Sequence, residues 1–315
     1  MKPENTSVIA LGSGSAIAKP ETRSHARFLA YADAFASYQV VVYGKNEEWS
    51  DAEGKKKVCV VSDEIKPLLP FQLFWKLFLA TRSTKGLRLI TVQDPFVLGV
   101  IAYIVSWITG TPLHVQVHVD LSSRFFREAS WYNRFQVLLA HFVLPRAQAV
   151  RVVSEETKEW ILHNTKTIKP ITVLPIARHE ALRKVSEKEI TSLRESLDMP
   201  RLVLLGIGRF VTDKRFDDII SAFSKTHSKH QDIHLVLVGN GPEKENLKAL
   251  VQEKDISSVV TFIDWTEDIA LYYAASDIFV SASLYEGWGM AIEEAASFKN
   301  AILTTRVGCV ATLFD

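Results

Sequence analysis

Runs of aliphatic and β-branched residues alternate along this chain with segments of helical periodicity. The first series opens with SVIALGSG at 7–14 and closes with ITVLPI at 171–176. After a charged stretch at 177–200, a second series runs from RLVLLGIGRF at 201–210 to NAILTTRVG at 300–308. Continuous apolar strands joined by helices are typical of parallel sheets covered on both faces. The pattern predicts an α/β chain of two tandem Rossmann-like doubly wound domains, over residues 1–175 and 176–315.

The two predicted domains differ in charge. The chain of 315 residues has a net charge of +1, which splits into +6 over residues 1–175 and −5 over 176–315. No bulk attraction to nucleic acid follows from the total, and no nucleic-acid partner is expected. A basic first domain that meets anions or an acidic membrane surface, and two ordinary domains of unequal charge, explain the split equally well.

Cysteine usage and hydropathy indicate a cytoplasmic protein. Cys59 and Cys309 are far apart in the sequence and predict neither a disulfide framework nor a metal cluster, which fits a reducing compartment. The N-terminus lacks the apolar core of a secretory signal. The most apolar run, FVLGVIAYIVSWI at 96–108, is shorter than the roughly 20 residues that span a bilayer, and a buried helix is expected there.

Three Gly-containing turns follow predicted strands of the second series, where doubly wound sheets bind ligands. In the first, GIGRFVTDKRFDD at 206–218, Gly206 and Gly208 are expected to turn the chain sharply. Arg209 and Lys214 then place two cations beside backbone N–H groups, which suits a diphosphate without a metal. An ordinary solvated loop is the alternative.

The second turn, LVGNGP at 237–242, contains Gly239, Asn240 and Gly241. Such a turn lets a ligand approach the backbone closely. A tight connection between a strand and a helix explains it equally well.

The third turn, EGWGMAIEEA at 286–295, leads into a predicted helix. Gly287 and Gly289 leave amides exposed at the helix start, where an anion is favoured. Glu286 suits sugar hydroxyls, and Glu294 can accept hydrogen bonds from a vicinal diol such as ribose. Phosphate, ribose and polyol together describe a nucleotide sugar. The alternative is a capping glutamate and a solvated helix face, with Glu293 incidental.

With these motifs in this order, residues 203–309 resemble the retaining glycosyltransferase family 4 (glycosyl transferases group 1), which has the GT-B fold. Glu286 and Glu294 fit the family's E-x7-E pattern, and Ala295 follows as is usual. VLPI at 173–176 looks like the strand at the domain junction. The N-terminal half resembles the family only loosely.

The resemblance implies roles for individual residues. Arg209 and Lys214 would hold the donor diphosphate, Glu294 the ribose, and Glu286 the transferred sugar. Phe262 and Ile263 would lie beside the base, and His118 close to the sugar. The implied catalytic residues are Glu286, His118, Arg209 and Lys214. The implied donor-binding residues are Gly12, Gly208, Arg209, Lys214, Gly239, Asn240, Gly241, Phe262, Ile263, Glu286, Gly287, Trp288, Gly289 and Glu294.

The resemblance also implies the chemistry. Family members retain the anomeric configuration, and a front-face displacement is favoured in which the leaving phosphate helps to deprotonate the acceptor. Glu286 would then bind the sugar and not act as a nucleophile. No metal and no cofactor are expected beyond the UDP- or GDP-linked sugar, since cations and helix dipoles take the leaving-group charge. The acceptor, a glycan or a lipid-linked glycan, would bind the first domain.

Three departures from the family pattern stand out. The first turn, GSGSAIAKPETR, lacks the usual paired glycines, which weakens Gly12 and Gly14 as candidates. Asp264 replaces a common glycine beside the base. Family members continue for roughly 60 residues beyond the equivalent of VGCVATLFD, so the second domain is expected to be an incomplete doubly wound unit.

Two stretches in the first domain mix basic and aromatic residues, at 66–88 and 122–135. Apolar faces flanked by Lys and Arg suit an interfacial helix on an anionic bilayer. A peripheral position at the inner face of the membrane is thus one interpretation. For residues 66–82, a core helix with basic ends is the slightly preferred alternative.

Three other classes of function are alternatives to a transferase. They are a nucleotide-sugar epimerase or glycogen-type synthase, a non-catalytic GT-B-like subunit that needs a partner, and a Rossmann oxidoreductase. The oxidoreductase ranks last because GSGSAI lacks the third glycine of its fingerprint. The presence of Arg209, Lys214, Glu286 and Glu294 favours catalysis over binding alone.

Overall fold

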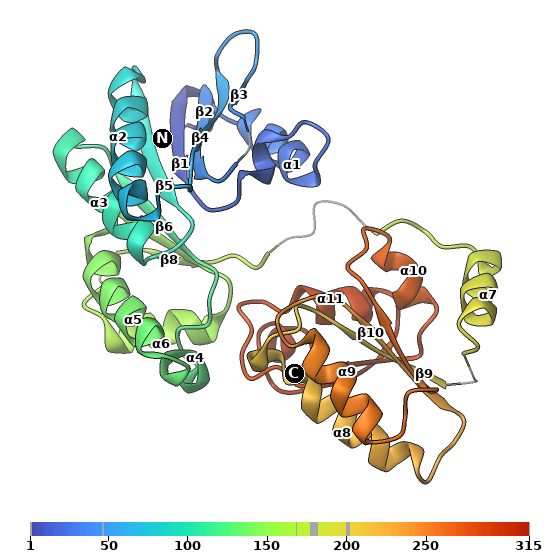
Figure 1. The fold of residues 1–315 in the computed structure, drawn as a ribbon. Coiled ribbons are helices and arrows are strands. Elements are labelled where there is room, and N and C mark those ends of the chain that lie inside the picture. The colour runs from blue at the N-terminus through green and yellow to red at the C-terminus, as the bar shows by residue number, and fades with distance from the viewer. Residues whose placement is uncertain (1, 46, 168, 177–181, 200–201, 315) are drawn as a thin grey trace. The chain divides into compact units, whose positions relative to one another are not determined.

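The chain divides into two compact units, residues 1–179 and 180–315. The computed structural model describes residues 2–45, 47–167, 169–176, 182–199 and 202–314. Each unit contains a sheet with helices on both faces (Figure 1). The predicted α/β class with two doubly wound sheets is confirmed. The predicted division after residue 175 lies four residues before the division in the structure.

The first unit contains an eight-stranded sheet of order β3-β4-β2-β1-β5-β6-β7-β8. All neighbouring strands are parallel except β3, which pairs antiparallel with β4 and was not predicted. The strands are β1 Thr6–Leu11, β2 Ser37–Tyr43, β3 Trp49–Ser50, β4 Lys56–Val61, β5 Leu87–Val92, β6 Leu113–Val117, β7 Ala149–Val152 and β8 Ile171–Val173. The helices are α1 Arg23–Ala32, α2 Leu69–Ser83, α3 Val97–Thr109, α4 Arg124–Glu128, α5 Trp131–Val143 and α6 Glu155–Asn164.

The second unit contains a five-stranded parallel sheet of order β11-β10-β9-β12-β13. Its strands are β9 Leu202–Ile207, β10 Ile233–Val238, β11 Val260–Ile263, β12 Ile278–Ser281 and β13 Ala301–Thr304. Its helices are α7 Glu187–Ser196, α8 Phe216–His227, α9 Lys244–Glu253, α10 Ile269–Ala274, α11 Met290–Ser297 and α12 Val310–Leu313. Helices α8 and α9 lie side by side on one face (Figure 1).

Local sequence sets the ends of several helices. Ser154 caps α6 by accepting a hydrogen bond from the Thr157 amide, which satisfies a backbone donor at the start of the helix. Ser186 and Glu189 form a capping box at the start of α7. Gly110 ends α3 in the left-handed conformation, with a φ of 63°. These caps explain why the boundaries fall where the strand and helix patterns change.

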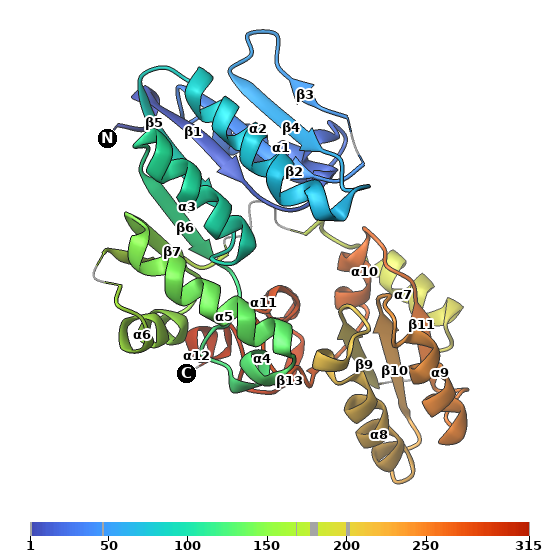
Figure 2. The same ribbon diagram turned by 60° about the vertical axis from the view of Figure 1, so that its left-hand side comes forward.

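Helices α2, α3 and α5 lie in a row along one face of the first sheet (Figure 2). The prediction that residues 96–108 form a buried helix is wrong for one side of α3. Ala102 and Val105 are fully buried, but Trp107 is 75% exposed. The exposed large apolar side chains of the three helices form one surface, here named the apolar face. It consists of Phe71, Trp75, Leu79, Ile104, Trp107, Ile108, Trp131, Tyr132, Phe135, Leu138 and Phe142.

The helices of the apolar face combine apolar side chains with one sign of charge. Residues 69–83, 97–109 and 131–143 contain Lys76, Arg82 and Arg134 but neither Asp nor Glu. Within the described part of the chain, no helix is both long enough and apolar enough to cross a membrane.

Candidate functional site

The carboxyl ends of four parallel strands in the second unit lie at one edge of the sheet. β9, β10, β11 and β12 are followed by the loops that begin at Gly208, Gly239, Asp264 and Ala282. Because parallel strands end at the same edge, these loops lie together there. The predicted second-unit site residues are thus brought to a single edge, or to the helix that follows it.

The loop after β9 is anchored at both ends by aromatic side chains. Phe210 and Phe216 are buried, and their rings meet edge to face with centroids 4.9 Å apart. Arg215 has a φ of 52° and turns the chain into α8. Such left-handed backbone in a non-glycine residue is uncommon and marks a locally constrained turn. The constraint leaves Arg209 and Lys214 outside the core, on the loop surface.

Lys214 forms an ion pair with Glu286, which comes from the loop after β12. Glu286 also accepts a hydrogen bond from the Ser283 hydroxyl at 2.9 Å. The two loops are joined again where the Leu284 amide donates to the Asp213 carbonyl at 2.9 Å. Both charged side chains are only about one fifth exposed, at 20% and 19%, so solvent screens their attraction weakly.

Arg209 differs from Lys214 in having no carboxylate partner. Its side chain is exposed, and among the described residues it makes neither an ion pair nor a hydrogen bond. Burial raises the pKa of Tyr285, and the nearby charge of Arg209 partly offsets that rise. Arg209 is therefore available to an anion at this edge.

The start of α11 provides a set of backbone donors. Gly289 caps the helix in a conformation that favours glycine, with a φ of 83°. Within the described chain, the amides of residues 287–291 have no hydrogen-bond acceptor. Free N–H groups at a helix N-terminus attract anions. Gly287 and Gly289 thus lie where the sequence predicted an anion site, directly after the ion-paired Glu286.

Glu294 lies on α11 and is held by a buried tyrosine. The Tyr273 hydroxyl donates to its Oε2 at 2.8 Å. Tyr273 itself is fully buried, and its hydroxyl lies 3.3 Å from the Ala291 carbonyl. This orientation fixes one carboxylate oxygen before any ligand binds. Tyr273 was not predicted as a site residue, because nothing in the local spacing connects α10 with α11.

Trp288 and Glu293 have structural roles that the sequence did not predict. Trp288 is only 4% exposed, and its indole N–H donates to Glu293 at 2.7 Å. Its carbonyl accepts from the Cys309 amide at 2.6 Å. Glu293 is therefore not incidental: it anchors the tryptophan that fixes the loop. The side chain of Trp288, a predicted donor-binding residue, thus lies in the core, while its amide has no acceptor among the described residues.

The glycines after β10 make room for the neighbouring loop. A Cβ atom at Gly239 would lie 1.9 Å from the Gly208 carbonyl oxygen, and one at Gly241 would lie 2.3 Å from the Phe210 carbonyl oxygen. The Phe210 amide also donates to the Asn240 carbonyl at 2.9 Å. Close packing of the two loops explains these glycines, in place of the predicted approach of a ligand.

The glycines of the β9 motif also need a different reason. A Cβ at Gly206, inside β9, would lie 2.9 Å from Leu237, so packing within the unit favours glycine there. At Gly208 the same atom would lie 3.6 Å from Phe216, which is an ordinary contact. The φ of neither residue lies in the left-handed region. The sharp turn is made at Arg215, not at the two glycines.

The end of β11 lies beside the loop after β10. The Ile263 carbonyl accepts from the Gly239 amide at 2.9 Å, and the Phe262 ring packs against the core. Asp264 pairs with Lys244 and lies 3.2 Å from the Asn240 amide nitrogen. The hydrogen bond and charge of Lys244 lower the pKa of the exposed Asp264. Asp264, which stands where a glycine is common in the family, thus forms an ion pair with Lys244 in this loop.

Two predicted residues belong to the first unit. Gly12 follows β1, and a Cβ there would lie 2.7 Å from the Gln93 side chain. His118 follows β6 and lines a cavity of about 390 Å³ at the carboxyl edge of the first sheet. Burial, helped by the charge of Arg151, lowers the pKa of His118 to about 4. His118 is consequently neutral near pH 7.

Arg151 is a residue of this cavity that sequence reasoning missed. It lies on β7 and hydrogen-bonds to Gln116 at 2.9 Å and to the Leu174 carbonyl at 3.0 Å. A signal was present, since an arginine interrupts the apolar run AVRVV at 149–153. Among the described residues, no group of three or more His, Cys, Asp or Glu side chains is placed to hold a metal ion.

Comparison with known proteins shows what the second unit is similar to. Residues 188–315 match the family model described as glycosyl transferases group 1. The lipopolysaccharide core biosynthesis glycosyltransferase LpsE of Rhizobium meliloti is 33% identical over 115 residues, which are 36% of this chain and 33% of that protein. The GPI3 subunit of phosphatidylinositol N-acetylglucosaminyltransferase from Saccharomyces cerevisiae is 28% identical over 183 residues, 56% of this chain and 39% of that protein. The chain thus spans about a third of the length of these two relatives.

The whole fold also has solved counterparts. The crystal structure of Anabaena Alr3699/HepE in complex with UDP and glucose has a TM-score of 0.75 and 20% identity. The similarity covers 98% of this chain and 83% of that chain. The fold is therefore GT-B, as the motif resemblance predicted.

Proposed function

Since the second unit carries a glycosyl transferases group 1 domain, we propose that the chain is a glycosyltransferase that takes a sugar from a nucleotide diphosphate and retains its anomeric configuration. The observation that carries this proposal is the combination of Lys214, ion-paired with Glu286, and the unbonded amides of 287–291. A cation and helix N-terminal donors suit a diphosphate, and the carboxylate beside them suits sugar hydroxyls. The UDP in the Anabaena complex supports a UDP-linked donor, with GDP as the other base to test.

In the proposed reaction, the bond between the anomeric carbon and the diphosphate oxygen breaks. The acceptor oxygen attacks from the same face, and its proton passes to the departing phosphate. Lys214, Arg209 and the α11 amides take the leaving-group charge, which is why we propose that no metal is needed. Glu294 accepts hydrogen bonds from the ribose, in the orientation set by Tyr273. Glu286 binds the transferred sugar and is not a nucleophile.

His118 keeps its predicted role near the donor sugar as part of the proposal. Its neutral ring can donate through one nitrogen and accept through the other, because burial holds its pKa near 4. A neutral imidazole suits a sugar hydroxyl better than a phosphate. Its replacement by glutamine keeps one donor and one acceptor, and should therefore preserve more transfer than replacement by alanine.

For the acceptor, we propose a lipid-linked glycan or glycolipid reached from an anionic membrane surface at the cytoplasmic side. The apolar face supports this, because its helices carry cations but no Asp or Glu. Two hollows lie along it. One, of about 490 Å³, is lined only by apolar side chains of α2, α3 and α5. The names of the two relatives, with lipopolysaccharide and phosphatidylinositol, fit such an acceptor.

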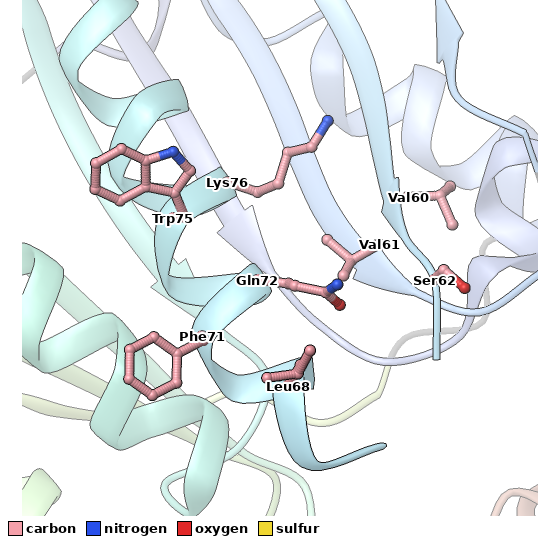
Figure 3. Close-up of a pocket in the computed structure, with 8 residues that line it drawn as sticks. All are labelled: Val60, Val61, Ser62, Leu68, Phe71, Gln72, Trp75 and Lys76. Atoms are coloured by element: carbon pink, nitrogen blue, oxygen red, sulfur yellow. The ribbon is translucent and has the colours of Figure 1, made fainter. Parts of the chain in front are cut away.

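The second hollow lies between α2 and the end of β4 (Figure 3). It measures about 590 Å³ and includes Leu68, Phe71 and Trp75. In Figure 3, Phe71 and Trp75 project outward from α2, away from Val60 and Ser62. Lys76 bonds to Glu48 at 2.7 Å at its rim. Outward aromatics next to basic side chains are typical of an interfacial surface that enters a headgroup layer.

The donor proposal is tested by calorimetric binding of UDP, GDP and ADP, followed by product analysis with the sugar nucleotide that binds. Micromolar binding of one nucleotide, lost in Glu294→Ala and Arg209→Ala, is expected. Transfer to an acceptor, with retention seen by NMR, supports the proposal. Binding without transfer supports the non-catalytic alternative, and an epimeric sugar nucleotide as product supports an epimerase.

The membrane proposal is tested by flotation with liposomes that contain anionic or only zwitterionic lipid. The chain should float with anionic liposomes, and Trp107→Ser should float less. Trp265→Ser is the matched control, since Trp265 is 64% exposed but lies in the second unit. Equal flotation of the two variants, or no flotation at low salt, would contradict the proposal.

A further inference from the structure

The cavity beside His118 contains more charge than the proposed donor chemistry uses. Its polar lining comes from the loops after β1 and β5, from α1, from the end of β6 and from β7. The polar residues relevant here are Ser13, Ser24, Arg27, Gln93, His118 and Arg151. Two of these carry a positive charge, and among the described residues no Asp or Glu lines the cavity. Such a cavity is electropositive without an internal counter-charge.

Arg151 is held entirely by neutral groups. Its guanidinium donates to the Leu174 carbonyl, to the Pro175 carbonyl at 3.1 Å and to Gln116 at 2.9 Å. Among the described residues, no carboxylate pairs with it. Partial burial lowers the pKa of Arg151, which shows that its charge is poorly solvated. An anion in the cavity would supply the missing compensation.

Arg27 lies on α1, and its side chain is exposed at the cavity. In the described part of the chain, Arg27 makes neither an ion pair nor a hydrogen bond. It therefore contributes charge to the cavity without a structural task. The serine hydroxyls of Ser13 and Ser24 add donors that suit phosphate oxygens.

We infer that this cavity binds a phosphate group of the acceptor, through Arg27 and Arg151. A phosphate monoester carries about 1.5 to 2 negative charges at neutral pH, which matches two uncompensated arginines. Arg27 can offer the planar donor fork that suits phosphate geometry, and Arg151 adds the one N–H group that its bonds to Leu174, Pro175 and Gln116 leave over. That the phosphate belongs to an acceptor rests on the proposed transferase function. The phosphate site itself does not depend on catalysis.

The test is NMR titration of the full chain with glycerol 3-phosphate, with glycerol as the uncharged control. UDP is present at saturation, so that the anion site of the second unit is filled. The His118 ring signals, assigned by their absence in His118→Gln, report on the cavity. A saturable shift is expected with glycerol 3-phosphate and none with glycerol. Dihexanoyl phosphatidic acid, titrated in parallel below its micelle concentration, shows whether the site prefers a free phosphate or a lipid headgroup.

Two variants locate the binding. Arg27→Gln should weaken the affinity for glycerol 3-phosphate at least tenfold, and Arg82→Gln, at an exposed arginine of α2 outside the cavity lining, should leave it unchanged. The absence of a saturable His118 shift, or equal affinity of Arg27→Gln and the unmodified chain, would overturn the inference. Failure of the donor proposal would appear separately, as absence of UDP binding in calorimetry while the His118 shift persists. If calorimetry shows no UDP binding, the titration with glycerol 3-phosphate is run without UDP.

Discussion

The cations of the two units have different partners. In the second unit, Lys214 is paired with Glu286, and both are largely buried. In the first, Arg151 contacts only neutral acceptors, and Arg27 has no ionic partner among the described residues. A diphosphate that binds Lys214 must therefore break its ion pair with Glu286, and the Glu286 carboxylate can then accept hydrogen bonds from sugar hydroxyls. A phosphate in the first unit displaces nothing. The site in the second unit can thus select ligands that pair with both Lys214 and Glu286, whereas the cavity in the first unit attracts an anion through unpaired positive charge.

The largest expected effect comes from removing the compensating charge in the second unit. Glu286→Gln should lower sugar transfer about 100- to 1,000-fold, the range for loss of a group that acts on the reacting centre. UDP affinity should not fall, because Lys214 no longer has a competing carboxylate. Transfer assays and calorimetry measure the two quantities. Glu253→Gln, at an exposed glutamate on α9, is the control. A parallel loss of UDP affinity would break the comparison.

The second prediction concerns pH and the first unit. The pKa of His118 is near 4 in the folded chain and 6.5 in ordinary surroundings, so the unfolded chain binds more protons between these values. The contribution of His118 to stability is complete above pH 6.5 and is lost as the pH falls toward 4, by about 3 kcal/mol. Denaturant unfolding at several pH values, compared with His118→Gln, measures it. Equal pH dependence of the two proteins would show that burial and the charge of Arg151 do not lower the pKa of His118.

A third prediction tests how strongly the pair in the second unit is coupled. Lys214→Ala leaves Glu286 buried with only Ser283 as a partner, and should cost about 2 to 3 kcal/mol of stability. The double variant Lys214→Ala with Glu286→Gln should recover at least 1 kcal/mol of that loss. Unfolding followed by the Trp288 indole NMR signal reports on this loop. Additive effects of the two changes would mean that the charges act independently.

The sequence pattern anticipated the features that depend on local chemistry. Alternating strands and helices predicted both sheets, and the spacing of Glu286 and Glu294 placed both on one loop-helix element. The pairing of Lys214 with Glu286 brings together residues 72 positions apart, and only the sheet order places their loops together. Trp288 depends on the fold in the same way, because its carbonyl accepts from the amide of Cys309, which lies beyond β13.

Other features were hidden because sequence does not record which side of an element meets a neighbour. The apolar run of α3 looks the same whether Trp107 is covered or exposed. Gly239 and Gly241 are needed because another loop packs against them, and a turn motif does not distinguish a loop from a ligand. The edge strand β3 has two residues, too few for a periodic signal.

The smallest expected effect completes the contrast between the units. Arg27→Gln should change the unfolding free energy by less than about 0.5 kcal/mol, since an exposed side chain without partners contributes little to stability. The same change should weaken phosphate binding at the cavity. Denaturant unfolding of the first unit, read from the His118 signals, measures the first quantity. A loss of stability near that of Lys214→Ala would show that Arg27 has a structural task after all. The cavity of the first unit would then resemble the site of the second unit, where the positive charge of Lys214 is already paired within the protein.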